Sequence, residues 1–227
     1  MHEKLRDKVA IVGMHARTRD DAPYKDLDFE IWVSNEMPGY VSRFDVLFEV
    51  HDFREFQAKK RNTMHYDWMK ENIKHPIYMS KVYDEIPMSI VYPYQEIIAE
   101  YGQYIVSTIV LQLLLAMYMK YNEIHIYGCE LSTKEEEYSI QKACFEHHLG
   151  YALGLRKATG KPIIFIPKNS ELLKSVHVYG RDGVSQLPYI LMNAKQAAEK
   201  EQTKQIHEMM GMVGKAEYNR GRKDAIK

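Results

Sequence analysis

Short apolar segments recur along the first three-quarters of the chain, and segments with helical spacing separate several of them. Strands that are covered on both faces of a parallel sheet read as nearly continuous apolar runs. Their alternation with helices is typical of an α/β fold. The pattern therefore predicts a mostly parallel sheet of about six strands flanked by helices. The predicted strands are Val9–Val12, Phe29–Val33, Val46–Val50, Ile77–Met79, Ile124–Tyr127 and Ile163–Ile166.

Three helices are predicted between these strands. Residues 53–72 are highly charged and should lie on the surface, whereas residues 103–121 are apolar almost all round and should pack flat on the sheet. Residues 134–159 carry an apolar stripe at helical spacing, formed by Ile140, Ala143, Cys144, Tyr151, Ala152 and Leu155. Residues 80–94 contain two prolines and no clean period, which predicts an irregular segment able to act as a lid.

The end of the chain has a different pattern. From about Ile190 a long polar helix is predicted toward Asn219, interrupted by a charged gap at residues 199–205. We therefore expect an α/β domain over residues 1–187 and a C-terminal helical arm over residues 188–227. The arm is expected to contact another subunit in a homo-oligomer or to fray.

Composition narrows the classes of partner. The 227 residues carry 31 Lys and Arg against 31 Asp and Glu, so the chain lacks the basic surplus of a nucleic-acid-binding protein. The start shows no signal peptide, and the longest apolar run, residues 105–119, is too short to cross a membrane. We expect a cytoplasmic protein with no membrane partner. Its two cysteines are expected to be reduced thiols.

Candidate chemistry gathers where the predicted strands end. Ligands of open parallel sheets bind outside the carboxyl ends of the strands. The residues there, together with the start of the apolar helix, are Gly13, Arg19, Asn35, Glu36, His51, Asp52, Ser107, Thr108, Gly128 and Glu130. We therefore expect polar groups from five segments to meet at one sheet edge.

The glycine and amide positions suit a nucleotide. Gly13 allows the backbone to approach a ligand and Arg19 can hold an anion, although a strand-ending glycine with a solvated loop explains them equally well. Asn35 and Glu36 suit the edge of a base or a ribose hydroxyl, or form an ordinary turn. The sequence contains neither a Gly-x-Gly-x-x-Gly motif nor a phosphate-binding P-loop.

Titratable and hydroxyl groups add candidate acid–base chemistry. His51 and Asp52 form an acid/base pair or half of a metal site, although neighbours on a strand point to opposite faces. Ser107 and Thr108 either cap the apolar helix or hold a phosphate at its N-terminus.

The third predicted helix and the tyrosines carry further candidates. His147 is a second candidate base. Cys144 and His148 have the spacing of helical metal ligands, but Cys144 also fits the apolar stripe, and no complete metal site is predicted. A group of tyrosines either lines an aromatic pocket or forms a packing layer; its members are Tyr78, Tyr83, Tyr92, Tyr94, Tyr101 and Tyr104.

The ordered motifs carry a resemblance over about Asp7 to Tyr179. The motifs are Val9-Ala-Ile-Val-Gly13, Asp28-Phe-Glu-Ile-Trp-Val-Ser-Asn-Glu36, Phe48-Glu-Val-His-Asp52, Pro76-Ile-Tyr-Met79 and Glu123-Ile-His-Ile-Tyr-Gly128. They look like a group of uncharacterised Rossmann-like proteins found mainly in bacteriophages. This resemblance implies a Rossmann-like fold and, for a phage-encoded protein, the host cytoplasm.

A more distant likeness suggests an activity. The order of glycine, asparagine and Ser/Thr-led helix is similar to bacterial sialyltransferases and to pterin diphosphokinase-like domains. In sialyltransferases the matching positions contact a cytidine nucleotide donor, which implies that Gly13, Asn35, Ser107 and Thr108 bind a nucleotide here. The chain departs from them in its first loop, which reads Met14-His15-Ala16-Arg17 in place of an Asn-Gly-Pro-Ser-like run.

The sequence thus predicts a protein that binds a nucleotide or a nucleotide-sugar at the carboxyl edge of its sheet. Whether it is an enzyme is left open. If it is, we expect a glycosyltransferase with His51 or His147 as general base and Arg19 on the phosphates. Diphosphate transfer would instead require Mg²⁺, with Asp52 and Glu130 as candidate ligands. The alternative from another class is a non-catalytic module that sequesters a nucleotide or assembles through the arm.

Overall fold

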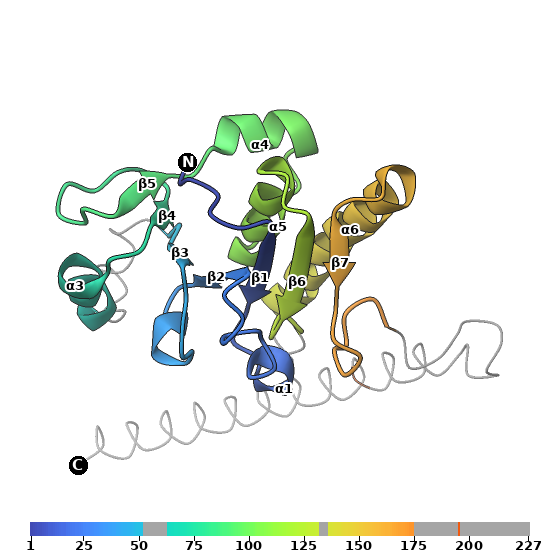
Figure 1. The fold of residues 1–227 in the computed structure, drawn as a ribbon, viewed down its shortest axis with the longest axis horizontal. Coiled ribbons are helices and arrows are strands. Elements are labelled where there is room, and N and C mark those ends of the chain that lie inside the picture. The colour runs from blue at the N-terminus through green and yellow to red at the C-terminus, as the bar shows by residue number, and fades with distance from the viewer. Residues whose placement is uncertain (52–62, 132–135, 175–194, 196–227) are drawn as a thin grey trace, which may run out of the picture. The chain divides into compact units, whose positions relative to one another are not determined.

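Seven parallel strands form one sheet in the order β5-β4-β3-β2-β1-β6-β7 (Figure 1). The structure is a computed structural model that describes residues 1–51, 63–131, 136–174 and Lys195. Its strands are β1 (Lys8–Val12), β2 (Phe29–Ser34), β3 (Val46–Phe48), β4 (Ile77–Met79), β5 (Ser89–Val91), β6 (Glu123–Tyr127) and β7 (Ile163–Phe165). The predicted α/β fold with a parallel, Rossmann-like sheet is confirmed.

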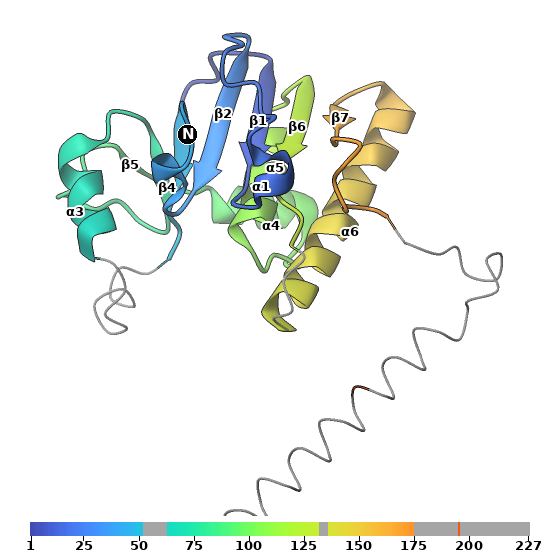
Figure 2. The same ribbon diagram turned by 90° about the horizontal axis from the view of Figure 1, so that it is seen from below.

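Helices cover both faces of this sheet. They are α1 (Ala16–Arg19), the 3₁₀ turn η1 (Met37–Gly39), α3 (Thr63–Asn72), α4 (Tyr94–Tyr101), α5 (Thr108–Tyr118) and α6 (Glu136–Thr159). Figures 1 and 2 show α5 and α6 along the β1, β6 and β7 side of the sheet, with α3 at the end near β4 and β5. Within the described residues, no helix is long and apolar enough to span a membrane.

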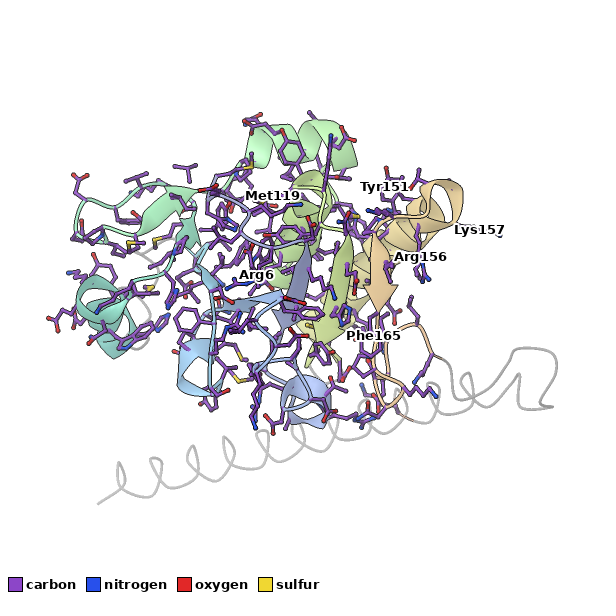
Figure 3. The ribbon with its side chains drawn as sticks, in the orientation of Figure 1. Arg6, Met119, Tyr151, Arg156, Lys157 and Phe165 are labelled. Atoms are coloured by element: carbon purple, nitrogen blue, oxygen red, sulfur yellow. The ribbon has the colours of Figure 1, made fainter. Side chains whose placement is uncertain are left out.

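Alternating side chains divide the core into two clusters. On β1, Val9 and Ile11 pack with α4, α5 and α6, whereas Ala10 and Val12 pack with α3 and η1. Residues 110–117 of α5 are all buried, as predicted for a helix lying flat on the sheet. The edge strand β7 is less covered. Its Phe165, labelled in Figure 3, is 42% exposed and stacks on His125 with ring centroids 4.7 Å apart.

The region predicted to be irregular has no helix or strand over residues 80–88, but it carries β5 and ends where α4 begins. β5 lies within residues 80–94 and pairs with β4, so the sheet has seven strands rather than six. α4 follows Pro93, and α5 begins at Thr108 rather than near residue 103. Residues 103–107 therefore form a connecting loop instead of the first turn of the apolar helix.

The buried face of α6 differs from the predicted stripe. Cys144 and Ala152 are fully buried, but Ile140 and Tyr151 are about half exposed, and the core contacts come instead from Phe145, His148 and Leu149. Both cysteines of the chain are free and buried.

The chain divides into two units, Met1–Leu173 and Lys174–Lys227. The α/β sheet belongs to the first. The predicted boundary at residue 187 lies outside the described residues, as do Asp52 and all of the predicted arm except Lys195.

A buried carboxylate on β2 ties the N-terminal segment to the sheet. Glu30 is 1% exposed, and its Oε1 accepts hydrogen bonds from the backbone N–H groups of Leu5 (2.8 Å) and Arg6 (3.1 Å). Its Oε2 lies 3.1 Å from His2 Nε2 and accepts from Trp32 Nε1 at 3.2 Å. Burial raises the pKa of Glu30, but these donors more than offset it, so the net pKa is lowered.

We expect Glu30→Gln to destabilise the fold by about 2–3 kcal/mol at pH 7, because the negative charge is lost and one acceptor oxygen is replaced by an amide nitrogen that faces hydrogen-bond donors. The folded-state pKa lies below the unfolded value of about 4.3, so this contribution is complete above pH 4.3 and is lost as the pH falls through the folded pKa. Urea unfolding of the wild type and of Glu30→Gln should show a difference in the free energy of unfolding that is smaller at pH 3 than at pH 7. A difference that is the same at both pH values would contradict the stabilising role of the ionised Glu30.

Candidate functional site

A cavity of about 430 Å³ lies at the carboxyl edge of the sheet, between the end of β3 and the start of α5. This volume falls in the range of small-molecule sites. Its lining comes from the residues after β3, from α4, from the loop before α5 and from α5 itself. The lining residues are Val50, His51, Tyr94, Ile98, Gln103, Ile105, Val106, Ser107, Thr108 and Leu111.

The direction of α5 sets the polarity of this cavity. The residues after α5 lie at the amino edge, because the Asn122 N–H donates to Asp7 O just before β1 (2.8 Å). The N-terminus of α5 therefore lies at the carboxyl edge, where its unpaired N–H groups and partial positive charge favour an anion. Thr108, the first residue of α5, is part of the cavity wall.

Ser107 occupies the N-cap position of α5 without capping it. Its side chain makes no capping hydrogen bond, and its Oγ is buried with no hydrogen-bond partner among the described residues. Ser107 is also part of the cavity wall. A buried hydroxyl without a hydrogen-bond partner costs folding free energy. The start of α5 therefore has a hydrogen-bonding group that the described residues leave unsatisfied.

An imidazole and a carboxylate lie on the strand side of the cavity. β3 ends at Phe48, so His51 lies beyond the strand, and its Nδ1 is 2.8 Å from Glu49 Oε1. Glu49 is 1% exposed and is also approached by His65 of α3, whose Nε2 lies 3.3 Å from Glu49 Oε2. The cavity thus combines a helix N-terminus with a group that can exchange a proton near neutral pH.

Side chains of α6 contact the backbone of the loop before α5. The carbonyl oxygen of Tyr104 lies 3.1 Å from Cys144 Sγ and 2.7 Å from His148 Nε2. Burial lowers the pKa of His148, which keeps its imidazole neutral at pH 7. These two side chains, whose spacing suits metal ligands, position the cavity rim instead. No cluster of metal-ligating side chains occurs in the described part of the chain.

The crevice between β1 and β6, where the strand order reverses, is closed by the protein's own groups. His15 N–H donates to Gly128 O at 2.9 Å. An added Cβ on Gly13 would lie 2.5 Å from Gly128 O. Thr18 Oγ1 accepts from the Gly128 N–H (2.6 Å) and donates to Glu130 Oε1 (2.9 Å). Gly13 and Gly128 are therefore close-packing glycines, and neither lines the cavity.

Glu130 is fully buried in the same closed crevice. Its Oε1 accepts from Thr18, and its Oε2 accepts from Ser170 Oγ at 2.7 Å. Because two hydroxyl groups occupy its oxygens, Glu130 links three segments of the fold and is not presented to a ligand.

Comparison with protein-family models, with curated proteins and with solved structures found no match. The site must therefore be interpreted from its own geometry.

The other predicted site residues lie away from the cavity lining. Arg19 donates to Asp20 Oδ1 (2.9 Å) and to Met14 O (3.2 Å), which holds its own loop together. Asn35 adopts a left-handed conformation (φ 54°), typical of a turn asparagine, and its Oδ1 is buried without a partner in the described region. Glu36 is exposed at the same turn. His147 is exposed on α6, with its ring 5.7 Å from that of Tyr104.

The tyrosines divide between the two predicted roles. Tyr78, Tyr83 and Tyr92 are buried in the core, where Tyr78 stacks on Phe48 with ring centroids 4.9 Å apart. Tyr94 lines the cavity, and burial raises the pKa of its hydroxyl. Three of the six tyrosines thus form a packing layer, and Tyr94 supplies the aromatic wall of the cavity.

Proposed function

We propose that this protein binds a nucleotide or a nucleotide-sugar in the cavity between β3 and α5. The proposal rests on one observation: the N-terminus of α5 and the imidazole of His51 line the same cavity. The helix N-terminus suits a phosphate. Tyr94 and the aliphatic residues Ile98, Ile105 and Leu111 suit the face of a base or a sugar.

If the protein is an enzyme, glycosyl transfer fits this arrangement. His51 takes the proton of an acceptor hydroxyl, and that oxygen bonds to the anomeric carbon of the donor. The bond from this carbon to the donor phosphate breaks, and its electron pair leaves with the phosphate at the α5 N-terminus. Diphosphate transfer is less well supported, because Glu130 is already hydrogen-bonded on both oxygens.

A thermal-shift screen tests the proposal directly. The purified protein is melted with nucleoside mono-, di- and triphosphates and with nucleotide sugars, each with and without Mg²⁺, since a ligand of the native state raises Tm. We expect a metal-independent shift with cytidine or uridine nucleotides. A shift that requires Mg²⁺ and ATP would support diphosphate transfer, and no shift with any nucleotide would refute the proposal.

Replacing His51 with alanine separates a transferase from a sequestering module. For a transferase we expect kcat to fall by about 10²–10⁴-fold while the nucleotide-induced Tm shift persists, because a general base contributes about that factor to the rate. The measurement is release of the nucleotide from the sugar donor found in the screen. Tight binding by the wild type without any release would instead identify a sequestering protein.

A further inference from the structure

Glu49 is a buried carboxylate placed between two imidazoles. It follows β3 directly and is 1% exposed, with its Oε1 2.8 Å from His51 Nδ1. Its other oxygen lies 3.3 Å from His65 Nε2, without the alignment of a full hydrogen bond. His65 is itself buried and stacks on Trp68, with ring centroids 5.9 Å apart and an interplanar angle of 13°.

The ionisation of Glu49 decides where the proton of His51 lies. Burial raises the pKa of this carboxyl, but the hydrogen bond from His51 and the nearby His65 ring outweigh burial, so the net pKa is lowered and the group is ionised at pH 7. A carboxylate only accepts hydrogen bonds. His51 Nδ1 must therefore carry a hydrogen, which makes Nε2 the basic nitrogen of the neutral ring.

This arrangement matches the physical task of a general base. A carboxylate on one ring nitrogen fixes the tautomer and orientation, so that the other nitrogen exchanges protons with the substrate. Tyr94 is another titratable group on the cavity wall, and it is a neutral phenol at pH 7 because its ordinary pKa is about 10 and burial raises it further. His51 thus remains the group suited to proton transfer near neutral pH.

We infer that Glu49 is a positioning residue for proton transfer in the cavity, fixing the tautomer and orientation of His51 while His65 lies beside the second oxygen of Glu49. The inference deepens the proposed function and rests on it for the ligand. The arrangement of the three side chains does not require a ligand, so it can be tested separately.

Nitrogen NMR of the full chain labelled with ¹⁵N-histidine tests the inference. At a pH where His51 is neutral, we expect the wild type to carry its ring proton on Nδ1. In Glu49→Leu the acceptor for Nδ1–H is lost altogether, and the Nε2–H tautomer should become the major form. Glu96→Leu, at an exposed carboxylate of α4, is the matched control and should leave the His51 resonances unchanged.

A wild-type ring protonated on Nε2, or an unchanged tautomer in Glu49→Leu, would overturn the inference. The wild-type measurement decides the question even if the variant does not fold. Adding inorganic phosphate tests the cavity separately, because an anion at the α5 N-terminus should shift the Nε2 resonance of His51. An Nδ1–H ring in a protein that binds neither phosphate nor nucleotide would support the positioning by Glu49 and refute the proposed ligand.

Discussion

Replacing Gly128 with alanine is expected to lower Tm by about 6–12 °C, which corresponds to a loss of at least about 3 kcal/mol for a chain of this size. Gly128 has φ 63°, a conformation that costs L-residues energy. An added Cβ would lie 2.3 Å from Gly13 O and 2.9 Å from Gly13 C. Both are backbone atoms of Gly13, at the end of the central strand β1, so they cannot move without distorting the sheet.

Gly150→Ala provides the matched control. Gly150 lies on the exposed surface of α6, and an added Cβ there meets nothing within 4 Å. We expect this variant to gain about 0.5–1 kcal/mol, since alanine is the better helix former. Calorimetric melting of the two variants and the wild type makes the comparison. Equal Tm values for Gly128→Ala and the wild type would show that the contact between the two strand ends is loose.

Gly128 also illustrates what the sequence can and cannot predict. A glycine after a strand predicts a close approach of the backbone, and this is what the structure has, but the approaching group is Gly13 rather than a ligand. The need for a glycine at such a position depends on the local backbone, so it can be predicted from the sequence. The identity of the neighbouring group depends on which strands become neighbours, and β1 and β6 are more than 100 residues apart.

The fold was predictable where apolar runs are long. The central strands and α5 bury continuous apolar segments, and their positions follow from the pattern alone. β5 was missed because three residues with an exposed end, Ser89–Val91, give no measurable alternation. α4 was missed although Pro93, just before it, is a recognised helix-start signal.

The site was predictable only in part. The rule that ligands bind at strand ends selects His51, and the helix-start rule selects Ser107 and Thr108; these three share the cavity. The same rules also select Gly13, Gly128 and Glu130, which instead close the crevice at the strand-order reversal. Glu49 escaped prediction because it was read as the interior of a longer strand. The signal was its spacing of two residues from His51, which favours a shared side.

Thr108→Asp is expected to abolish the nucleotide-induced Tm shift while leaving the free protein as stable as the wild type or more so. A carboxylate in the first turn of a helix stabilises it by about 0.3–1 kcal/mol, and α5 has no acidic residue there. The same carboxylate would repel a phosphate bound at that helix start. Like charges placed together cost several kcal/mol, so we expect affinity to fall more than about 100-fold.

Thr108→Asn is the control for this substitution, because asparagine has nearly the shape of aspartate without the charge. We expect it to retain most of the Tm shift, and titration calorimetry with the nucleotide found in the screen should give affinities that separate the two variants. Higher stability together with lost binding in the aspartate variant cannot arise from general damage to the fold, so this pair of changes isolates the charge. If both variants bind the nucleotide equally well, its phosphate lies elsewhere and the α5 N-terminus is not the anion site.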